Sequence, residues 1–490
     1  MKRIAIIGGG ISGLAAMHRL IELSTTNRQP IHITLLEASS RLGGTIQTEH
    51  RDGFLLERGP DSFIAEKPEA VALSRRLGIE SHLIQTNEQH RRSFIVRNGR
   101  LRAVPQGFQL LAPSRLWPFI NSDIFSVTGK LRMSMDLFLP RRAVDGDESL
   151  ASFVRRRLGR EALERMAQPM VGGIYTADPE VLSLRATLPR FLEIEREHRS
   201  LLLGMWRRGR TSKSETGVSG ARYSLFLSFD EGMELLVDAL ERKIADFRLQ
   251  IEDLVHSEIR LKTRVESLDQ DRAQNWQIRT ASGGTLEVDA VCLAVPAYAA
   301  ASLLTRTAPQ ISSQLSQIKF ASTATINLGY SRSDIGHKLD GFGFVVPFIE
   351  KRSLIACTFS SVKFSGRAPK DLVLLRAFVG GALQPKMLTL DEAEIVKRVA
   401  ADLKDLLRIT GKPLFSEVAL WHNSMPQYEV GHLDRIEQVE SEVTKVAGLT
   451  LAGNSYRGAG IPDCIRSGEM AAELMMGTLR DLRLQTSDLI

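Results

Sequence analysis

The chain begins with two short apolar runs on either side of a segment with helical spacing. Residues 4–7 and 31–36 each have the length of a buried strand, and residues 12–23 carry apolar side chains three or four positions apart. A strand, a helix and a second strand in this order form a β-α-β unit. The start of the chain therefore predicts two strands joined by a crossover helix.

The same patterns predict further elements downstream. A helix is expected over Pro68–Leu77, because proline stands near its start and glycine just past its end. Residues 91–102 are typical of a basic hairpin that turns at Asn98-Gly99. Further expectations are a helix with Met233, Leu236, Val237, Leu240 and Ile244 on one face, strands at 288–295 and 449–453, and a helix from about Asp463.

Composition excludes several classes of protein. The 490 residues are 43% hydrophobic and 25% charged, which excludes a disordered chain and a fibrous repeat. Three scattered cysteines form neither a zinc ribbon nor a disulfide framework, so we expect no metal and a reducing compartment, the cytoplasm. The most apolar window, Ala290–Leu304, is too short to span a membrane. A net charge of +7 does not select a partner.

A glycine motif follows the first strand and opens the first helix. Gly8, Gly10 and Gly13 have the GxGxxG spacing, which lets the backbone approach a pyrophosphate at the N-terminus of a helix. Glu37 ends the second strand, where an acidic side chain hydrogen-bonds an adenosine ribose. This combination predicts a dinucleotide site.

Two further segments favour a flavin over a nicotinamide. Arg41-Leu42-Gly43-Gly44 resembles the second flavin fingerprint of the amine-oxidase-like flavoproteins, in which the arginine can face phosphate. The segment LAGNSYRGAGIPDCIRSGEMAA near the C-terminus resembles the isoalloxazine segment of the same superfamily. Its helix would direct a positive N-terminal dipole at the anionic reduced ring.

Four stretches narrow the resemblance. They are GPDSF (59–63), FDEGMELLVDAL (229–240), WHNSMPQYEVGH (421–432) and GNSYRGAGIPDCI (453–465). In this order they are similar to the oxygen-dependent protoporphyrinogen and coproporphyrinogen oxidases of heme biosynthesis, and the resemblance runs from the first strand to the last helix.

The resemblance implies a set of FAD-binding residues. These are Gly8, Gly9, Gly10, Ile11, Ser12, Gly13, Glu37, Ala38, Arg41, Gly44, Thr45, Arg58, Gly59, Pro60, Asp61, Val265, Trp421, Asn454, Ala459, Gly460 and Ile461.

It also implies a porphyrinogen pocket. The carbonyl of Gly173 would accept from pyrrole N–H groups, and Phe342, Gly343 and Val345 would form a wall, although core packing explains Phe342 equally well. Animal-type members hold a propionate with an arginine at the position that reads Ser93 here. Arg97 is therefore a candidate carboxylate ligand, and a solvated basic hairpin is the alternative. Tyr175 and Met425 are weaker candidates, more typical of the core.

The implied chemistry belongs to FAD, and we assign no catalytic residue. Three two-electron oxidations would convert the porphyrinogen to the porphyrin, with molecular oxygen reduced to hydrogen peroxide. Coproporphyrinogen III, protoporphyrinogen IX or both are candidate substrates, and the arginine-rich hairpin slightly favours a pocket that accepts both.

Two other kinds of function stay open at this point. Another flavoenzyme of the superfamily, such as a carotenoid desaturase or amine oxidase, is the nearest alternative. The strand Thr323–Leu328 carries no lysine of the kind that amine oxidases place near the flavin, and Lys319 precedes it. A nucleic-acid-binding protein lacks support, because no basic face with interleaved aromatic residues is present.

We expect three domains, in an α/β and α+β arrangement. A Rossmann-like FAD-binding domain would comprise residues 1–85, about 225–300 and 440–490. A mixed-sheet substrate domain would comprise about 86–105 and 301–440. A helical domain, about 106–224, would end in a polar mobile loop at 207–222.

Residues 105–140 are a candidate membrane or partner surface. Trp117, Phe119, Phe125 and Phe138 are mixed there with Arg115, Lys130 and Arg132. Packing on the domain core is the equally weighted alternative. A ferrochelatase partner and a homodimer are also left open.

Overall fold

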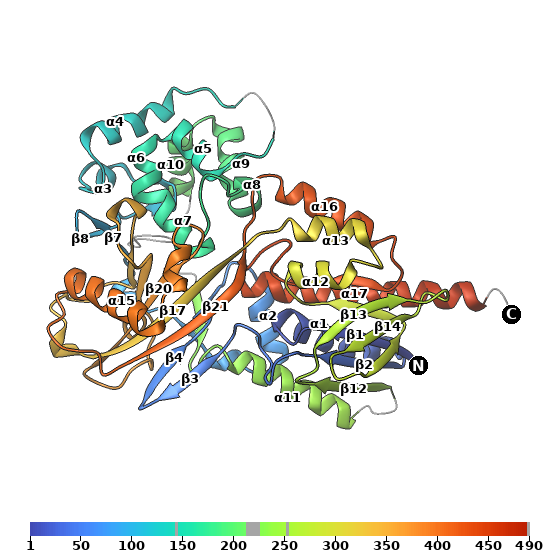
Figure 1. Ribbon diagram of the computed structural model, residues 1–490. Coiled ribbons are helices and arrows are strands. Elements are labelled where there is room, and N and C mark those ends of the chain that lie inside the picture. Colours follow the sequence, from blue (N-terminus) through green and yellow to red (C-terminus); the bar gives the residue numbers. More distant parts are fainter. Residues whose placement is uncertain (143–145, 212–225, 251–253, 488–490) are drawn as a thin grey trace.

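The computed structural model describes residues 1–142, 146–211, 226–250 and 254–487. Figure 1 shows three parts: a sheet near both termini, a second large sheet, and a group of helices above the second sheet. No helix among the described residues is long and apolar enough to span a membrane.

The first part is built on a five-stranded parallel sheet. Its order is β12 (Val255–Arg260), β2 (Ile31–Leu36), β1 (Lys2–Ile7), β16 (Ala290–Leu293) and β22 (Leu449–Leu451). The strand order reverses beside β1, and ligands of such parallel sheets bind at the carboxyl ends of the strands at this point. Segments from the start, middle and end of the chain thus form one sheet, as the sequence predicts.

Alternation along β1 directs side chains to both faces of this sheet. Ile4 and Ile6 pack against α1 (Ile11–Asn27), α11 (Leu235–Gln250) and α17 (Ile461–Ser487). Ala5 and Ile7 pack toward the opposite layer. That layer comprises β13 (Val265–Gln270), β14 (Trp276–Thr280), β15 (Thr285–Val288), α12 (Ala297–Leu304), α13 (Pro309–Ser316) and α16 (His432–Val443).

Short elements connect this part to the second sheet. They are β3 (Thr48–Arg51), β4 (Phe54–Glu57), β5 (Phe63–Ile64), α2 (Glu69–Arg76), β6 (Leu83–Gln85) and β11 (Phe226–Phe229). Single-turn helices are η1 (Glu80–His82), η2 (Glu88–His90), η3 (Met135–Leu137), η6 (Arg332–Asp334), η7 (Phe348–Glu350) and η8 (Pro385–Thr389).

The second sheet has seven strands. Its order is β21 (Phe415–Pro426), β17 (Phe320–Ser331), β20 (Leu372–Gly380), β19 (Ala356–Phe359), β18 (Gly343–Val345), β7 (Phe94–Arg97) and β8 (Arg100–Ala103). β18 and β7 are parallel and the other neighbours are antiparallel. α15 (Glu392–Leu407) packs on one face, and α14 (Ser360–Lys363) follows β19. The hairpin turn is confirmed, because Asn98 and Gly99 have φ of 50° and 68°.

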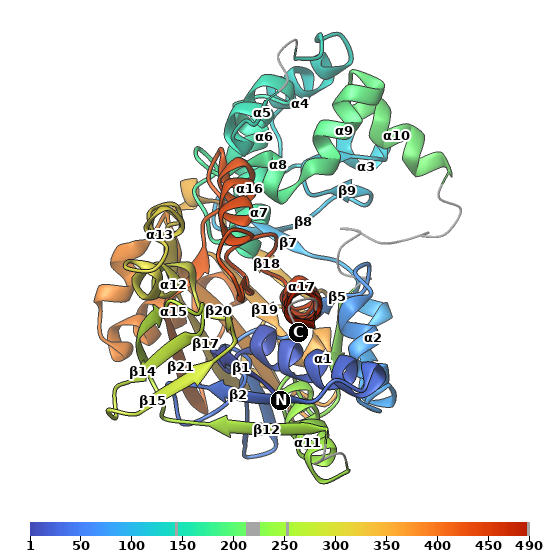
Figure 2. The same ribbon diagram turned by 90° about the vertical axis from the view of Figure 1, so that its right-hand side faces the viewer.

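The third part is helical (Figure 2). It comprises β9 (Phe108–Gln109), β10 (Ala112–Pro113), α3 (Leu116–Ile120), α4 (Val127–Ser134), α5 (Leu150–Arg157), α6 (Arg160–Ala162), the π-helical turn η4 (Leu163–Ala167), α7 (Gln168–Tyr175), α8 (Leu184–Thr187), α9 (Pro189–His198) and α10 (Leu201–Thr211).

Two expectations for the helical part are wrong in detail. Residues 207–211 continue α10 instead of forming a loop, and 212–222 lie outside the described residues. Phe119 and Phe125 are buried, because their rings, with centroids 5.8 Å apart, pack together in the core of this part. Only Trp117 and Phe138 of the four aromatic side chains lie on the surface.

The predicted fold class is confirmed, while the domain bounds stay a prediction. Residues 94–103 join the strands between 320 and 426 in one sheet, in agreement with the predicted substrate domain. In contrast, α13 and α16 pack beneath the parallel sheet, although the predicted bounds place most of both helices in the substrate domain.

Candidate functional site

Close packing explains two of the three motif glycines. Gly8 has φ of 109°, and a Cβ there would lie 2.4 Å from the carbonyl oxygen of Ala294 in the loop after β16. A Cβ on Gly13 would lie 1.9 Å from the carbonyl oxygen of Gly8. Glycine is therefore required for α1 to start directly above β1.

Gly10 differs from both neighbours because its space is open. It has extended backbone angles, and a Cβ there would meet no protein atom within 4 Å. The first N–H groups of α1, which have no partners inside the helix, border this space. The arrangement fits an anionic group such as a pyrophosphate.

Glu37 holds its predicted place at the end of β2. Its two carboxylate oxygens accept from the N–H groups of Gly9, at 2.6 Å, and Ser39, at 2.7 Å. The N–H of Thr263 donates to the Glu37 carbonyl at 2.8 Å, which brings Val265, two residues later, to the same end of the sheet. Ala38 lies exposed beside it.

The loop after Glu37 reaches back to the glycine motif. Gly43 forms an isolated parallel bridge with Gly10, and a Cβ on Gly44 would lie 3.4 Å from the Gly10 Cα. Arg41 braces this loop, since it donates to the carbonyls of Gly44 and Ile46.

A carboxylate also accepts a hydrogen bond from Arg41. The Arg41 guanidinium pairs with Glu234 at 2.9 Å. Its charge is thus shared with a carboxylate, and a contact between Arg41 and phosphate stays a prediction.

The turn at residues 58–61 lies beside the same loop. A Cβ on Gly59 would lie 1.7 Å from the carbonyl oxygen of Thr45, so only glycine fits there. Two side chains of the second sheet, Thr325 at 2.6 Å and Trp421 at 2.9 Å, donate to the Arg58 carbonyl. Trp421 therefore supports the turn, and Pro60 and Asp61 complete it.

The C-terminal segment closes the other side of the site. α17 crosses α1 so closely that a Cβ on Gly468 would lie 2.1 Å from the carbonyl oxygen of Ser12. At the start of α17, Ile461 is buried and Gly460 is exposed, with Ala459 partly exposed before them.

Asn454 and Cys464 complete this segment. The hydroxyl of Tyr428 donates to the Asn454 carbonyl, which ties the loop to the residues after β21. Cys464 is a free, buried thiol, and burial raises its pKa to about 12. A thiol in that state is a poor nucleophile.

Two predicted substrate residues, Gly173 of α7 and Val345 of the second sheet, lie next to each other. A Cβ on Gly173 would lie 3.6 Å from Val345 Cγ1, and Gly173 lies in the last turn of α7, where carbonyl oxygens lack helical partners. Gly343 has φ of 142° and faces the Cys357 carbonyl across the sheet. Phe342 is buried, as is Phe344, which packs in the core.

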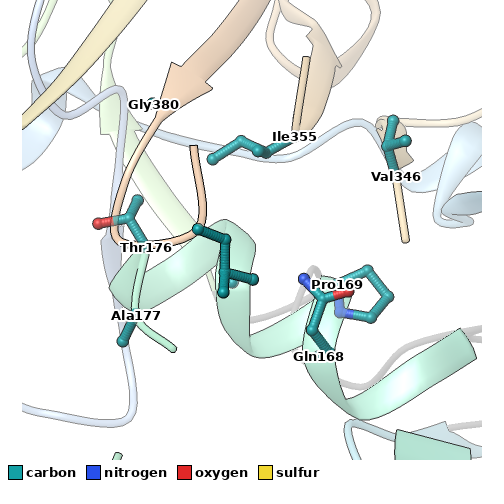
Figure 3. A pocket seen from close by; sticks show the side chains of 9 residues that line it. Gln168, Pro169, Thr176, Ala177, Val346, Ile355 and Gly380 are labelled. Carbon is teal, nitrogen blue, oxygen red and sulfur yellow. The ribbon is translucent and has the colours of Figure 1, made fainter. Parts of the chain in front are cut away.

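A small pocket lies next to these residues, between α7 and the second sheet (Figure 3). Gly172 and Val346, the neighbours of Gly173 and Val345, both line it. The other lining residues are Gln168, Pro169, Thr176, Ala177, Ile355, Gly380 and Leu383. Its lining is mainly apolar, and it is far smaller than a ligand pocket of ordinary size.

Carboxylates neutralise several arginines of the β7–β8 hairpin. Arg91 pairs with Glu88, Arg92 with Asp340, and Arg102 with Asp123. Arg97 has no ion pair within the described ranges, and its buried Nε has no hydrogen-bond partner there. Arg97 follows Ile95 by two positions, so both face the side that carries Val345. Ser93 is buried in the sheet.

Comparison with known proteins identifies the family. The sequence model of the flavin containing amine oxidoreductase family matches residues 11–476. The chain belongs to this family. Its cofactor is FAD, and the open space at Gly10, together with the free N–H groups of α1 and the placement of Glu37, fits that group.

Three relatives illustrate the similarity. A coproporphyrinogen III oxidase of Bacillus subtilis is 36% identical over 96% of this chain and 97% of its own. Protoporphyrinogen oxidase 2 of Arabidopsis thaliana is 26% identical over 98% of this chain and 94% of its own. The crystal structure of a candidate protoporphyrinogen oxidase from Exiguobacterium has a TM-score of 0.83 at 32% identity, covering 98% and 99%.

Apart from Asp61, the members of a charged cluster beneath the 58–61 turn were not predicted from the sequence. The side chains of this cluster are Glu57, Asp61, Lys363, Arg367 and Arg376. One signal was available, because Arg376 interrupts the apolar strand LVLLRAFVG. The lysine that precedes β17, Lys319, is instead exposed and pairs with Glu429.

Proposed function

We propose that this chain is an FAD-dependent oxidase that removes six electrons from a porphyrinogen and passes them to molecular oxygen. The observation that carries the proposal is the end-to-end similarity to a coproporphyrinogen III oxidase, combined with the open phosphate site at Gly10. A carotenoid desaturase or amine oxidase is less well supported, because these relatives act on porphyrinogens by name.

FAD bound here would supply the redox chemistry, which is three two-electron oxidations of the porphyrinogen with oxygen reduced to hydrogen peroxide. The chain's own residues bind and orient. The Gly10 region would hold the pyrophosphate, Glu37 would hold the ribose, and the turn at 58–61 would border the ring system. Gly173 and Val345 contact the macrocycle, and the apolar wall excludes water.

Coproporphyrinogen III is the substrate that the charges favour. It carries four propionates where protoporphyrinogen IX carries two. The Arg97 guanidinium has no partner among the residues that the structure describes, and it lies on the face of the sheet that carries Val345. A desolvated charge-assisted contact contributes about 1.5–3 kcal/mol, so its loss should cost roughly ten- to a hundredfold in kcat/KM.

The test compares both substrates in an assay of porphyrin fluorescence. We expect activity with coproporphyrinogen III and a larger loss for this substrate than for protoporphyrinogen IX in Arg97→Ala. Arg92→Ala is the matched control, because Asp340 already neutralises that side chain. Equal losses in Arg97→Ala would remove Arg97 from the pocket, and inactivity of the wild-type protein toward both would refute the proposed function.

We also propose that an apolar ridge on the helical part binds anionic membrane surfaces. The ridge comprises Leu116, Trp117, Ile120, Val127, Leu131, Met135, Leu137 and Phe138. Trp117 is 75% and Phe138 81% exposed, and the exposed arginines Arg115, Arg141 and Arg142 lie next to the ridge in sequence. Apolar anchors with nearby cations suit an anionic interface.

Vesicle flotation tests the ridge. Wild-type protein should float with vesicles that contain phosphatidylglycerol, and Trp117→Ala/Phe138→Ala should remain in the lower fraction. Tyr298→Ala, an exposed aromatic side chain outside the helical part, is the control. If the wild-type protein remains in the lower fraction with every vesicle composition, the ridge does not bind membranes. A ferrochelatase partner, a homodimer and a cytoplasmic location stay predictions.

A further inference from the structure

The backbone of the 58–61 turn is held from the side of the second sheet. Asn327 donates to the Glu57 carbonyl at 3.2 Å, and Thr325 and Trp421 donate to the Arg58 carbonyl. The guanidinium of Arg376 donates to the carbonyl of Gly59. Three successive carbonyls are therefore fixed, and the turn cannot rotate without breaking several hydrogen bonds.

A charged pair lies directly behind this turn. Lys363 Nζ lies 2.9 Å from Asp61 Oδ2 and 3.1 Å from Ser62 Oγ, and Arg376 lies 3.8 Å from the same Asp61 oxygen. The side chains of Lys363 and Arg376 are 7% and 4% exposed. The Nε of Arg376 is buried and has no hydrogen-bond partner in the described parts of the chain.

Three cations and two carboxylates form this cluster, and Glu417 also lies near Arg376. Lys363, Arg367 and Arg376 face Glu57 and Asp61, while nearby Glu417 pairs with Arg58 at 3.0 Å. Burial would raise the pKa of Asp61, but the charges of Lys363 and Arg376 hold it below its ordinary range. Burial raises the pKa of Glu57 to about 7 despite the hydrogen bond that it accepts from the N–H of Met233. Part of this carboxyl group is therefore neutral near pH 7, which reduces the negative charge of the cluster.

We propose that Arg376 is a positioning residue that fixes the turn against bound FAD and supplies the positive charge that favours the reduced, anionic cofactor. The inference rests on the proposed function, because the family resemblance is what places the turn beside the ring system. Buried charges are weakly screened, so one cation within about 10 Å shifts such an equilibrium by roughly tenfold. Arg376 acts through the turn and through its field.

The test measures the midpoint potential of bound FAD by reductive titration with reference dyes, at pH 8 and without porphyrinogen. Arg376→Gln should lower the ratio of reduced to oxidised cofactor about tenfold, which is about 30 mV for a two-electron couple. Arg376→Lys keeps the charge and should stay within about threefold of wild type. Arg352→Gln is the control, because the Arg352 guanidinium pairs with Asp402 and Asp405, which are not members of this cluster.

Glu57→Gln supplies a second measurement of opposite sign. Glu57 is charged at pH 8, so its neutral replacement should raise the potential while leaving every cation in place. This variant decides the matter if Arg376→Gln does not fold.

The outcomes separate a structural role from an electrostatic one. A role in folding alone would lower the melting temperature of Arg376→Gln and leave the potential unchanged, and this result would overturn the inference. So would Arg376→Lys shifting the potential as far as Arg376→Gln, or Glu57→Gln lowering it. If the midpoint potentials of the variants change as expected but the protein forms no porphyrin, the inference about Arg376 stands and the proposed substrate is wrong.

Discussion

Replacement of Gly10 by valine separates cofactor binding from folding. In the free chain the new Cβ would point into space that holds no protein atom within 4 Å, and the extended angles of Gly10, φ −73° and ψ 178°, suit valine. The expected cost to the free energy of unfolding is the loss of a good N-cap residue, about 1 kcal/mol. The side chain would instead fill the space proposed for the pyrophosphate.

The magnitude follows from the contacts that would be lost. Each charge-assisted hydrogen bond between a helix N–H and phosphate contributes about 1.5–3 kcal/mol. Displacing the phosphate from two such donors should raise the Kd for FAD by between about two and four orders of magnitude.

The assay is a titration of FAD-free protein, followed by flavin fluorescence, together with urea unfolding of the same samples. Gly78→Val is a matched control for adding the side chain, since a Cβ there also meets open space, although its φ of 76° adds backbone strain. Gly10→Val protein that binds FAD with wild-type affinity would refute the assignment of the site. A collapse of folding without FAD would show that the space is needed by the chain itself.

Three other predictions concern stability. Gly13→Ala should lower the free energy of unfolding by about 1–3 kcal/mol or more even without FAD, measured in urea, because the new Cβ would lie 1.9 Å from a carbonyl oxygen. Burial lowers the pKa of His18 and His432 to about 4, so between about pH 6.5 and 4 these two side chains bind protons in the unfolded chain but not in the folded one. The free energy of unfolding should therefore fall by up to about 3 kcal/mol per histidine as the pH falls through that range. A free energy of unfolding that does not change with pH would contradict this. Arg157→Ala would leave buried Asp136 without its ion pair and should cost about 3–5 kcal/mol by urea unfolding, against a small effect for the exposed Arg160→Ala.

Local rules explain what the sequence predicted well. The Asn98-Gly99 turn requires two residues with positive φ, and few other dipeptides provide them. The contact of Gly13 with the Gly8 carbonyl lies within one strand–helix junction and follows from neighbouring residues, whereas the contact of Gly8 with Ala294 does not. Four strands of the five-stranded sheet were also predictable, because each carries its own apolar run, whereas β12, with the sequence VHSEIR, does not.

Long-range contacts explain what the sequence could not predict. Arg41 pairs with Glu234, 193 positions later, and no local pattern shows that partner. Lys363 and Arg376 reach the 58–61 turn only because the second sheet folds against it. Phe119 is part of a weak amphipathic pattern whose apolar side chains face both the core and the solvent, so its burial could not be read from spacing.

Porphyrin formation by the FAD-loaded protein tests the central claim most directly. Purified protein would be supplied with coproporphyrinogen III in air, while porphyrin is followed by fluorescence and hydrogen peroxide by a coupled dye. The account predicts three peroxide molecules for each porphyrin, and no more porphyrin from Gly10→Val protein than from buffer alone. Porphyrin formation at the same rate in Gly10→Val protein without bound FAD, or none from the wild-type protein with either porphyrinogen, would contradict it.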